Sequence, residues 1–298
     1  MLDPEELYDL GPDVPELDSP VLLCGLDGFV DAGGIGALVR EQVISQPENV
    51  TVATFDVDQL IDYRSRRPTM TYVEDHWATY DTPELVLRTA RDSLGTPFLL
   101  LTGPEPDYQW ERFVAAVRGL VERLGVRLTV GFHGIPMAVP HTRPIGLTAH
   151  ATRPELVAGH TRWLSEVRVP GSVSALLEFR LGQAGHDALG FAAHVPHYLA
   201  QASYPAAALA VLDAIIAATG LALPADQLRA AARTADAQIA RQVENSDEIG
   251  SVVRMLEEQY DSYLRAQEED MPTADELGAQ FEQFLAEHDQ HGNDTPDR

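Results

Sequence analysis

Short apolar runs recur through the first two-thirds of the chain, each followed by a more polar stretch. The runs are rich in branched residues and only six to eight residues long, and that length suits strands better than helices. Turn residues bound most of them, as expected where a strand ends. We therefore predict buried strands at residues 21–26, 51–56, 97–103, 127–134 and 145–151.

Between these runs, apolar residues recur at the three- and four-residue spacing of a helix. Thr82, Pro83 and Glu84 add a cap residue, a first-turn proline and an early acid at the start of one such stretch. The spacing predicts helices at residues 33–46, 83–94 and 108–124. Alternating strands and helices indicate a layered α/β fold with a largely parallel sheet.

The last third contains helical patterns only, predicting helices at residues 204–220, 225–243, 246–269 and 273–288. The final ten residues have too little apolar content to order themselves. We expect four parts in the chain: an acidic segment at 1–18, an α/β domain at 19–222, a helical extension at 223–288 and a disordered tail at 289–298.

The last two predicted helices each carry an apolar stripe. Leu256 and Tyr260 lie on one stripe, and Leu277 and Phe281 lie on the other. Such stripes are typical of a core or a subunit interface. We therefore take these four residues as a candidate oligomer or partner interface.

The charge of the chain bears on its partners. The formal net charge is -25, and residues 1–20 hold seven acids and no base, while residues 244–298 hold sixteen acids and three arginines. This field repels phosphate backbones, so we expect no nucleic acid partner. No apolar run is long enough to span a bilayer, the start lacks a signal-peptide pattern, and Cys24 is the single cysteine. These features predict a cytoplasmic protein with no membrane partner.

All 21 basic residues are arginine. Without lysine, the chain lacks the residue that a Walker A loop places on phosphates and the amine that a Schiff-base enzyme uses. No G-x-S-x-G elbow is present, and the histidine pair His194 and His197 has no clear third metal ligand. We expect no cofactor, no metal and no catalytic residue set, which favours a binding protein over an enzyme.

Two stretches at predicted strand ends are candidates for an anion-binding cleft. In "DGFVDAGGIGAL", Asp31 can cap a helix while Gly33 and Gly34 allow close approach to its free N–H groups. In "GFHGIPMAVPHTRP", His141 and Arg143 could orient an anion. The alternatives are a tightly packed turn at the glycines and a rigid proline-rich connection at His141 and Arg143.

Several motifs taken together resemble the PAC2 family of proteasome assembly chaperone 2-like proteins, in its actinobacterial branch. The matching stretches occur in the family's order and are "GFVDAGG", "LTGPEPDYQWERF", "GIPMAVPHTRP", "LTAHAT" and "GFAAHVPHYLAQASYPAA". The resemblance implies a three-layer α/β/α sandwich, similar to the purine nucleoside phosphorylase/hydrolase-like fold, followed by a C-terminal helical extension. It also implies self-association, as a trimer in this branch.

The resemblance implies a non-catalytic scaffold or assembly chaperone that binds a protein partner, with proteasome subunits as the partner in some relatives. Some relatives dock through a tail of hydrophobic residue, tyrosine and any residue; Pro296-Asp297-Arg298 does not match it, so we do not expect that docking mode. The alternative is a small-molecule enzyme or binding protein that holds a nucleoside or an anion in a phosphorylase-like cleft.

Overall fold

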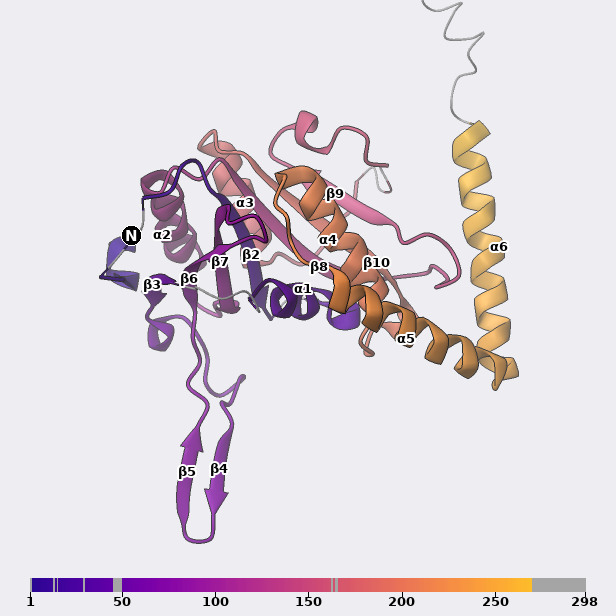
Figure 1. Ribbon diagram of the computed structural model, residues 1–298, viewed down its shortest axis with the longest axis horizontal. Coiled ribbons are helices and arrows are strands. Elements are labelled where there is room, and N and C mark those ends of the chain that lie inside the picture. Colours follow the sequence, from indigo (N-terminus) through magenta and orange to yellow (C-terminus); the bar gives the residue numbers. More distant parts are fainter. Residues whose placement is uncertain are drawn as a thin grey trace, which may run out of the picture.

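The centre of the protein is one eight-stranded sheet, and helices flank it (Figure 1). The computed structural model describes residues 2–12, 14, 16–28, 30–44, 50–161, 163 and 166–269. The strand order is β1-β3-β6-β7-β2-β8-β10-β9. The strands are β1 (Tyr8–Leu10), β2 (Val21–Asp27), β3 (Val50–Phe55), β6 (Val86–Arg91), β7 (Pro97–Pro104), β8 (Leu128–Met137), β9 (Leu147–Ala151) and β10 (Ala188–Pro196).

The direction of the strands divides the sheet into a parallel centre and antiparallel margins. The neighbours β7, β2, β8 and β10 are parallel. On one side β6, β3 and β1 follow with antiparallel pairings, and on the other side β9 pairs antiparallel with β10. Five of the eight strands, β3, β7, β2, β8 and β10, therefore point the same way, which confirms the predicted mostly parallel sheet.

Helices cover both faces of the sheet, because successive side chains of a buried strand point to opposite sides. One apolar core joins α1 (Ile35–Ile44) and α4 (Pro205–Thr219) to the face that carries Leu23, Val130 and Phe191. The other joins α2 (Trp110–Arg123) and α3 (Val173–Gln183) to the face that carries Leu22 and Leu101. The expected three-layer α/β/α sandwich is confirmed.

Most of the predicted elements are present. The five predicted strands correspond to β2, β3, β7, β8 and β9, and the predicted helices outside 83–94 correspond to α1, α2, α4, α5 (Asp226–Glu244) and α6 (Asp247–Glu269). The predicted helix at 273–288 and tail at 289–298 lie outside the described residues. The sequence pattern missed α3, β1, β10 and the two strands at Met70–Val73 and His76–Tyr80.

The predicted helix at 83–94 is wrong, because β6 occupies Val86–Arg91. This strand pairs with β3 on one side and β7 on the other. Its Leu87 enters one core and its Ala90 enters the other, so both of its faces are apolar. A strand that is buried on both faces does not alternate between apolar and polar residues. Its sequence pattern is then hard to distinguish from that of a short buried helix.

A β-hairpin projects from the sandwich, away from the other layers (Figure 1). Its strands β4 (Met70–Val73) and β5 (His76–Tyr80) form a separate two-stranded sheet. At the other end of the chain, α5 packs on α4, and α6 follows α5 as a long acidic helix. In the described part of the chain, no helix combines the length and the apolar character that crossing a membrane requires.

Asp92 joins the β6–β7 turn to the segment between α4 and α5. Its carboxylate accepts hydrogen bonds from the backbone N–H groups of Leu94, Thr96 and Ala222 at 2.9, 2.8 and 2.8 Å. Burial alone would raise the pKa of this carboxyl, but the three backbone hydrogen bonds outweigh it and lower the pKa.

We predict that Asp92→Ala lowers the free energy of unfolding by about 2–4 kcal/mol, because three backbone donors lose the buried carboxylate that accepts from them. Urea unfolding at pH 7 measures this change. Asp213→Ala, at an exposed position of α4, is the control and should change stability by less than about 0.5 kcal/mol. Equal stability of the two variants would contradict the assigned role of Asp92.

Candidate functional site

The carboxylate of Asp31 binds the free backbone N–H groups at the start of α1, which were the candidate site for an external anion. One carboxylate oxygen accepts from the backbone N–H of Gly36 at 2.9 Å and from that of Gly134 on β8 at 3.1 Å. The other oxygen lies 3.0 Å from the N–H of Gly36 and 3.3 Å from that of Ala37. Asp31 therefore caps α1, as its position suggested, and also ties this helix to the central sheet.

Gly33 and Gly34 form the tight turn that leads into α1. Both have positive φ angles, of 71° and 64°, which glycine adopts without strain. The N–H of Gly33 donates to the carbonyl of Ala200, and that of Gly34 donates to the carbonyl of Asp31. The carbonyl of Gly33 accepts from Tyr204 N–H, so the turn is bound to the segment that connects β10 and α4.

His141 is held by Tyr198. The phenol oxygen of Tyr198 lies 2.7 Å from Nδ1 of His141 and accepts from the backbone N–H of His141 at 3.0 Å. The two rings meet edge to face. Burial lowers the pKa of His141, with opposing contributions from Asp236 and Glu257, so its imidazole is mainly neutral near pH 7.

Arg143 directs its guanidinium at two acids of α6. Its Nε and Nη2 donate to the two carboxylate oxygens of Asp261 at 2.8 and 2.7 Å, and Nη1 lies 3.2 Å from Glu257. The hydrogen bond to Asp261 raises the pKa of Arg143, and the same contact lowers the pKa of Asp261. The arginine fork that was a candidate for an external anion is thus paired with two acids of α6.

Aromatic side chains complete the attachment of α6. Tyr263 stacks on the indole of Trp163 with ring centroids 5.6 Å apart, and Tyr260 lies on the same indole at 6.4 Å. Leu256 and Tyr260 are buried within the chain itself. Leu277 and Phe281, the other two residues of the candidate interface, lie outside the described residues.

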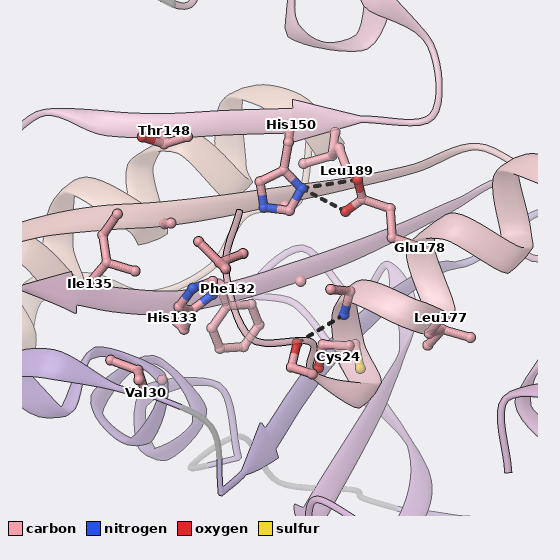
Figure 2. Close-up of a pocket in the computed structure, with 18 of the residues that line it drawn as sticks. Cys24, Val30, Phe132, His133, Ile135, Thr148, His150, Leu177, Glu178 and Leu189 are labelled. Carbon is pink, nitrogen blue, oxygen red and sulfur yellow. Dashed lines mark hydrogen bonds and ion pairs between the residues drawn. The ribbon is translucent and has the colours of Figure 1, made fainter. Parts of the chain in front are cut away.

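A cavity of about 620 Å³ lies on the α3 side of the sheet, between β8, β9, β10, α3 and the segment 166–172 (Figure 2). We call it the α3-side cavity. Among the five candidate cleft residues, Asp31 lines it, while Gly33, Gly34, His141 and Arg143 do not. The sequence reasoning did not identify this cavity.

The cavity arises from a size difference between the two faces of β8 and β10. The face toward α1 and α4 carries large apolar side chains, among them Val130, Phe132, Leu189, Phe191 and Val195. Alternate positions face the other way and carry small or polar residues, namely Thr129, Gly131, His133, Ala188, Gly190 and Ala192. This alternation is visible in the sequence and is the signal that could have revealed the cavity.

His150 and Glu178 form a hydrogen-bonded pair at the cavity wall, where Figure 2 shows them facing each other from β9 and α3. Nδ1 of His150 lies 2.9 Å from both carboxylate oxygens of Glu178. The His150 ring crosses Gly190, where an added Cβ would stand 2.2 Å from the ring. His133 faces the same space, and burial together with the charge of His150 lowers its pKa.

Two further groups line this wall. The hydroxyl of Thr129 is buried, at 4% exposure, and is the buried side-chain polar atom that has no hydrogen-bond partner among the described residues. Burial raises the pKa of the Cys24 thiol to about 12, against the lowering effect of a hydrogen bond with Ser174. A thiol in this state is mainly protonated and a poor nucleophile at neutral pH.

The three-layer sandwich with a mixed, mostly parallel sheet places the chain in a class of α/β proteins with several solved members. The family model for PAC2 matches residues 25–243, and the chain belongs to the PAC2 family. This match extends through most of α5. No curated protein matches the sequence significantly.

Two similar solved structures come from actinobacteria. The protein of unknown function Rv2714 from Mycobacterium tuberculosis is 50% identical, with a TM-score of 0.84 and coverage of 88% of this chain and 91% of that one. A protein of unknown function from Corynebacterium glutamicum is 38% identical, with a TM-score of 0.83 and coverage of 87% and 98%.

A more distant structure shares the fold. The proteasome-assembly chaperone homologue Rv2125 from Mycobacterium tuberculosis is 21% identical, with a TM-score of 0.72 and coverage of 78% of this chain and 99% of that one. At this identity the likeness concerns the arrangement of the elements alone.

His194 lies on β10 beneath the segment that contacts α6. Its side chain is buried, its Nε2 is 2.8 Å from the Thr148 hydroxyl, and its ring meets Trp163 edge to face at 4.9 Å. Burial lowers the pKa of His194 to about 4. The folded state therefore keeps this ring neutral at pH values where the unfolded chain binds a proton.

We predict that this difference reduces stability as the pH falls from 6.5 to 4.5, by about 2–3 kcal/mol from His194 alone. Urea unfolding across this range should show a shallower loss in His194→Gln than in the wild type. His76→Gln, on the exposed hairpin, should keep the wild-type slope. Parallel slopes for all three proteins would contradict the prediction.

Proposed function

We propose that this chain is a cytoplasmic, non-catalytic scaffold or assembly chaperone that works as a homo-oligomer, a trimer, and binds a protein partner. The observation that carries the proposal is the projecting hairpin of β4 and β5. Every residue of both strands is exposed in the single chain, although the hairpin is rich in apolar and aromatic side chains. Surfaces of this kind on a folded protein usually meet another protein.

The composition of the hairpin supports a protein contact. Trp77 and Tyr72 are 62% and 56% exposed and meet edge to face, and Met70, Val73 and Tyr80 are also exposed. Tryptophan, tyrosine and methionine are enriched in protein interfaces, where the aromatic side chains often carry much of the binding energy. An isolated two-stranded hairpin is marginally stable in water, so docking against a second copy of the chain would also stabilise its shape.

The choice of partner rests on similarity. Membership in the PAC2 family and the shared fold with the chaperone homologue Rv2125 favour an assembly role, with proteasome subunits as the partner class. The archaeal proteasome activator PbaB of Pyrococcus furiosus also shares the fold, with a TM-score of 0.58 at 17% identity and coverage of 80% of this chain and 99% of that chain.

The contacts that the candidate polar residues make within the chain support a binding function rather than catalysis. Asp31 is engaged by three backbone N–H groups, and Arg143 is paired with Asp261 and Glu257. The Cys24 thiol is protonated and buried. These contacts use the groups within the chain, where they position α1 and α6, and they weaken the case for an anion-binding cleft at His141 and Arg143.

We predict that the double substitution Tyr72→Ser and Trp77→Ser lowers the native mass of the oligomer to that of one chain, because it removes the largest apolar contacts of the hairpin. Light scattering after gel filtration measures the mass, and circular dichroism checks the fold. The matched control is Leu94→Ser, because the Leu94 side chain in the β6–β7 turn is 83% exposed. This variant should keep the oligomer. An unchanged mass in the double variant would overturn the assignment of the hairpin.

Partner binding is tested separately with purified actinobacterial proteasome α-subunits. We expect native mass spectrometry to show a complex with the wild-type chain and faster formation of α-subunit rings in its presence. The absence of both effects, with an intact oligomer, would reject the proteasome subunits as partners while leaving the self-association result in place.

A further inference from the structure

The Thr129 hydroxyl gives the first reason to assign a ligand to the α3-side cavity. This side chain lies on β8, lines the cavity and has no partner in the described part of the protein. A buried hydroxyl without a hydrogen bond destabilises a fold, and threonine here does not serve the packing of the large-residue core on the other face. A bound molecule with a hydrogen-bonding group would satisfy it.

The charge of the cavity restricts the class of molecule. The described lining holds three carboxylates, from Asp31, Glu166 and Glu178, and no arginine. The His150 ring is hydrogen-bonded to Glu178, and the lowered pKa of His133 leaves its ring mainly neutral near pH 7. An anionic ligand would therefore lose its hydration without gaining a cationic partner, whereas an uncharged or cationic group would meet acceptors.

The remaining lining is apolar and extends to the opening. Ile135 and Leu177 face the interior, and Val30, Val167 and Val169 line the cavity while being exposed to solvent. An apolar rim around a cavity of this size is typical of a site that takes a mainly apolar small molecule, because binding covers the rim as well as the walls.

We infer that the α3-side cavity binds a small amphiphile, with an apolar body and an uncharged or cationic hydrogen-bonding group that reaches Thr129 or Glu178. Nothing in the protein-binding role of the hairpin requires this site, which lies in the sandwich and not on β4 or β5. The hairpin variants and the cavity variants therefore test separate properties.

Gly131 offers a way to fill the cavity without disturbing the fold. A Cβ added at this position of β8 meets its nearest neighbour, the carbonyl oxygen of Leu189, at 4.0 Å. The backbone there is ordinary strand, so a larger side chain extends into the open space. Gly131→Leu blocks the cavity, and Gly119→Leu, at an exposed and uncrowded position on α2, is the matched control.

The probes are 1-octanol, octylamine and octanoate, which share one apolar tail and differ in the charge of the polar group. Binding is measured by isothermal titration calorimetry at pH 7 in 0.3 M salt. The salt screens the general attraction of the amine to the acidic protein surface. We expect octanol and octylamine to bind the wild type and Gly119→Leu, with octanoate at least tenfold weaker. Gly131→Leu should weaken octanol and octylamine at least tenfold without lowering the melting temperature.

Thr129→Val tests the hydroxyl. It keeps the shape of the side chain, so we expect octanol to bind about fivefold to tenfold more weakly while the stability of the free protein stays equal or rises. Three results would overturn the inference: no binding of any probe to the wild type, unchanged binding in Gly131→Leu, or a preference for octanoate.

Discussion

The structure depends on the alternation of large and small side chains along the central parts of β8 and β10. Since neighbouring residues of a strand face opposite ways, Val130, Phe132, Leu189 and Phe191 all enter the core beneath α1 and α4. Between them, Thr129, Gly131, His133, Ala188, Gly190 and Ala192 face α3. One face of the centre of the sheet is thus filled completely, and the other keeps open space that α3 does not close. A shift of one residue in the pairing of either strand would exchange these two environments.

Aromatic and apolar contacts, together with Arg143, explain how a strongly acidic helix stays attached to an acidic protein. The segment that contains α6 carries much of the negative charge of the chain. Arg143 binds two of its acids, while Trp163 offers an aromatic surface to Tyr260 and Tyr263. Partly exposed ion pairs contribute little by themselves, so the aromatic contacts and the burial of Leu256 carry most of the attachment, and Arg143 sets its register.

Local sequence patterns predicted much of this fold, because most of its strands and helices carry an apolar pattern long enough to distinguish a strand from a helix. The prediction of a helix at 83–94 was wrong because β6 is buried on both faces. That burial comes from pairing with β3 and β7 inside the sheet, and the residues of β6 alone do not reveal it. The cap formed by Asp31 was also predictable, since its acceptor role is local. Its bond to Gly134 and the pairing of Arg143 with Asp261 join residues about a hundred positions apart, and no spacing rule reveals them. The alternation along β8 and β10 marks the cavity in the sequence, but the apolar pattern predicts only β8 as a strand and misses β10.

The position of Cys24 has a consequence for covalent chemistry. This is the sole sulfhydryl of the chain, and it lies in the wall of the cavity and not on the outer surface. Two copies therefore cannot be cross-linked through sulfur while the sandwich remains closed. An oxidant or alkylating reagent must pass the valine-lined opening before it can react, so the rate of that reaction reports how readily the interior admits a molecule. The thiol of Cys24 is therefore a natural chemical probe of access to the cavity.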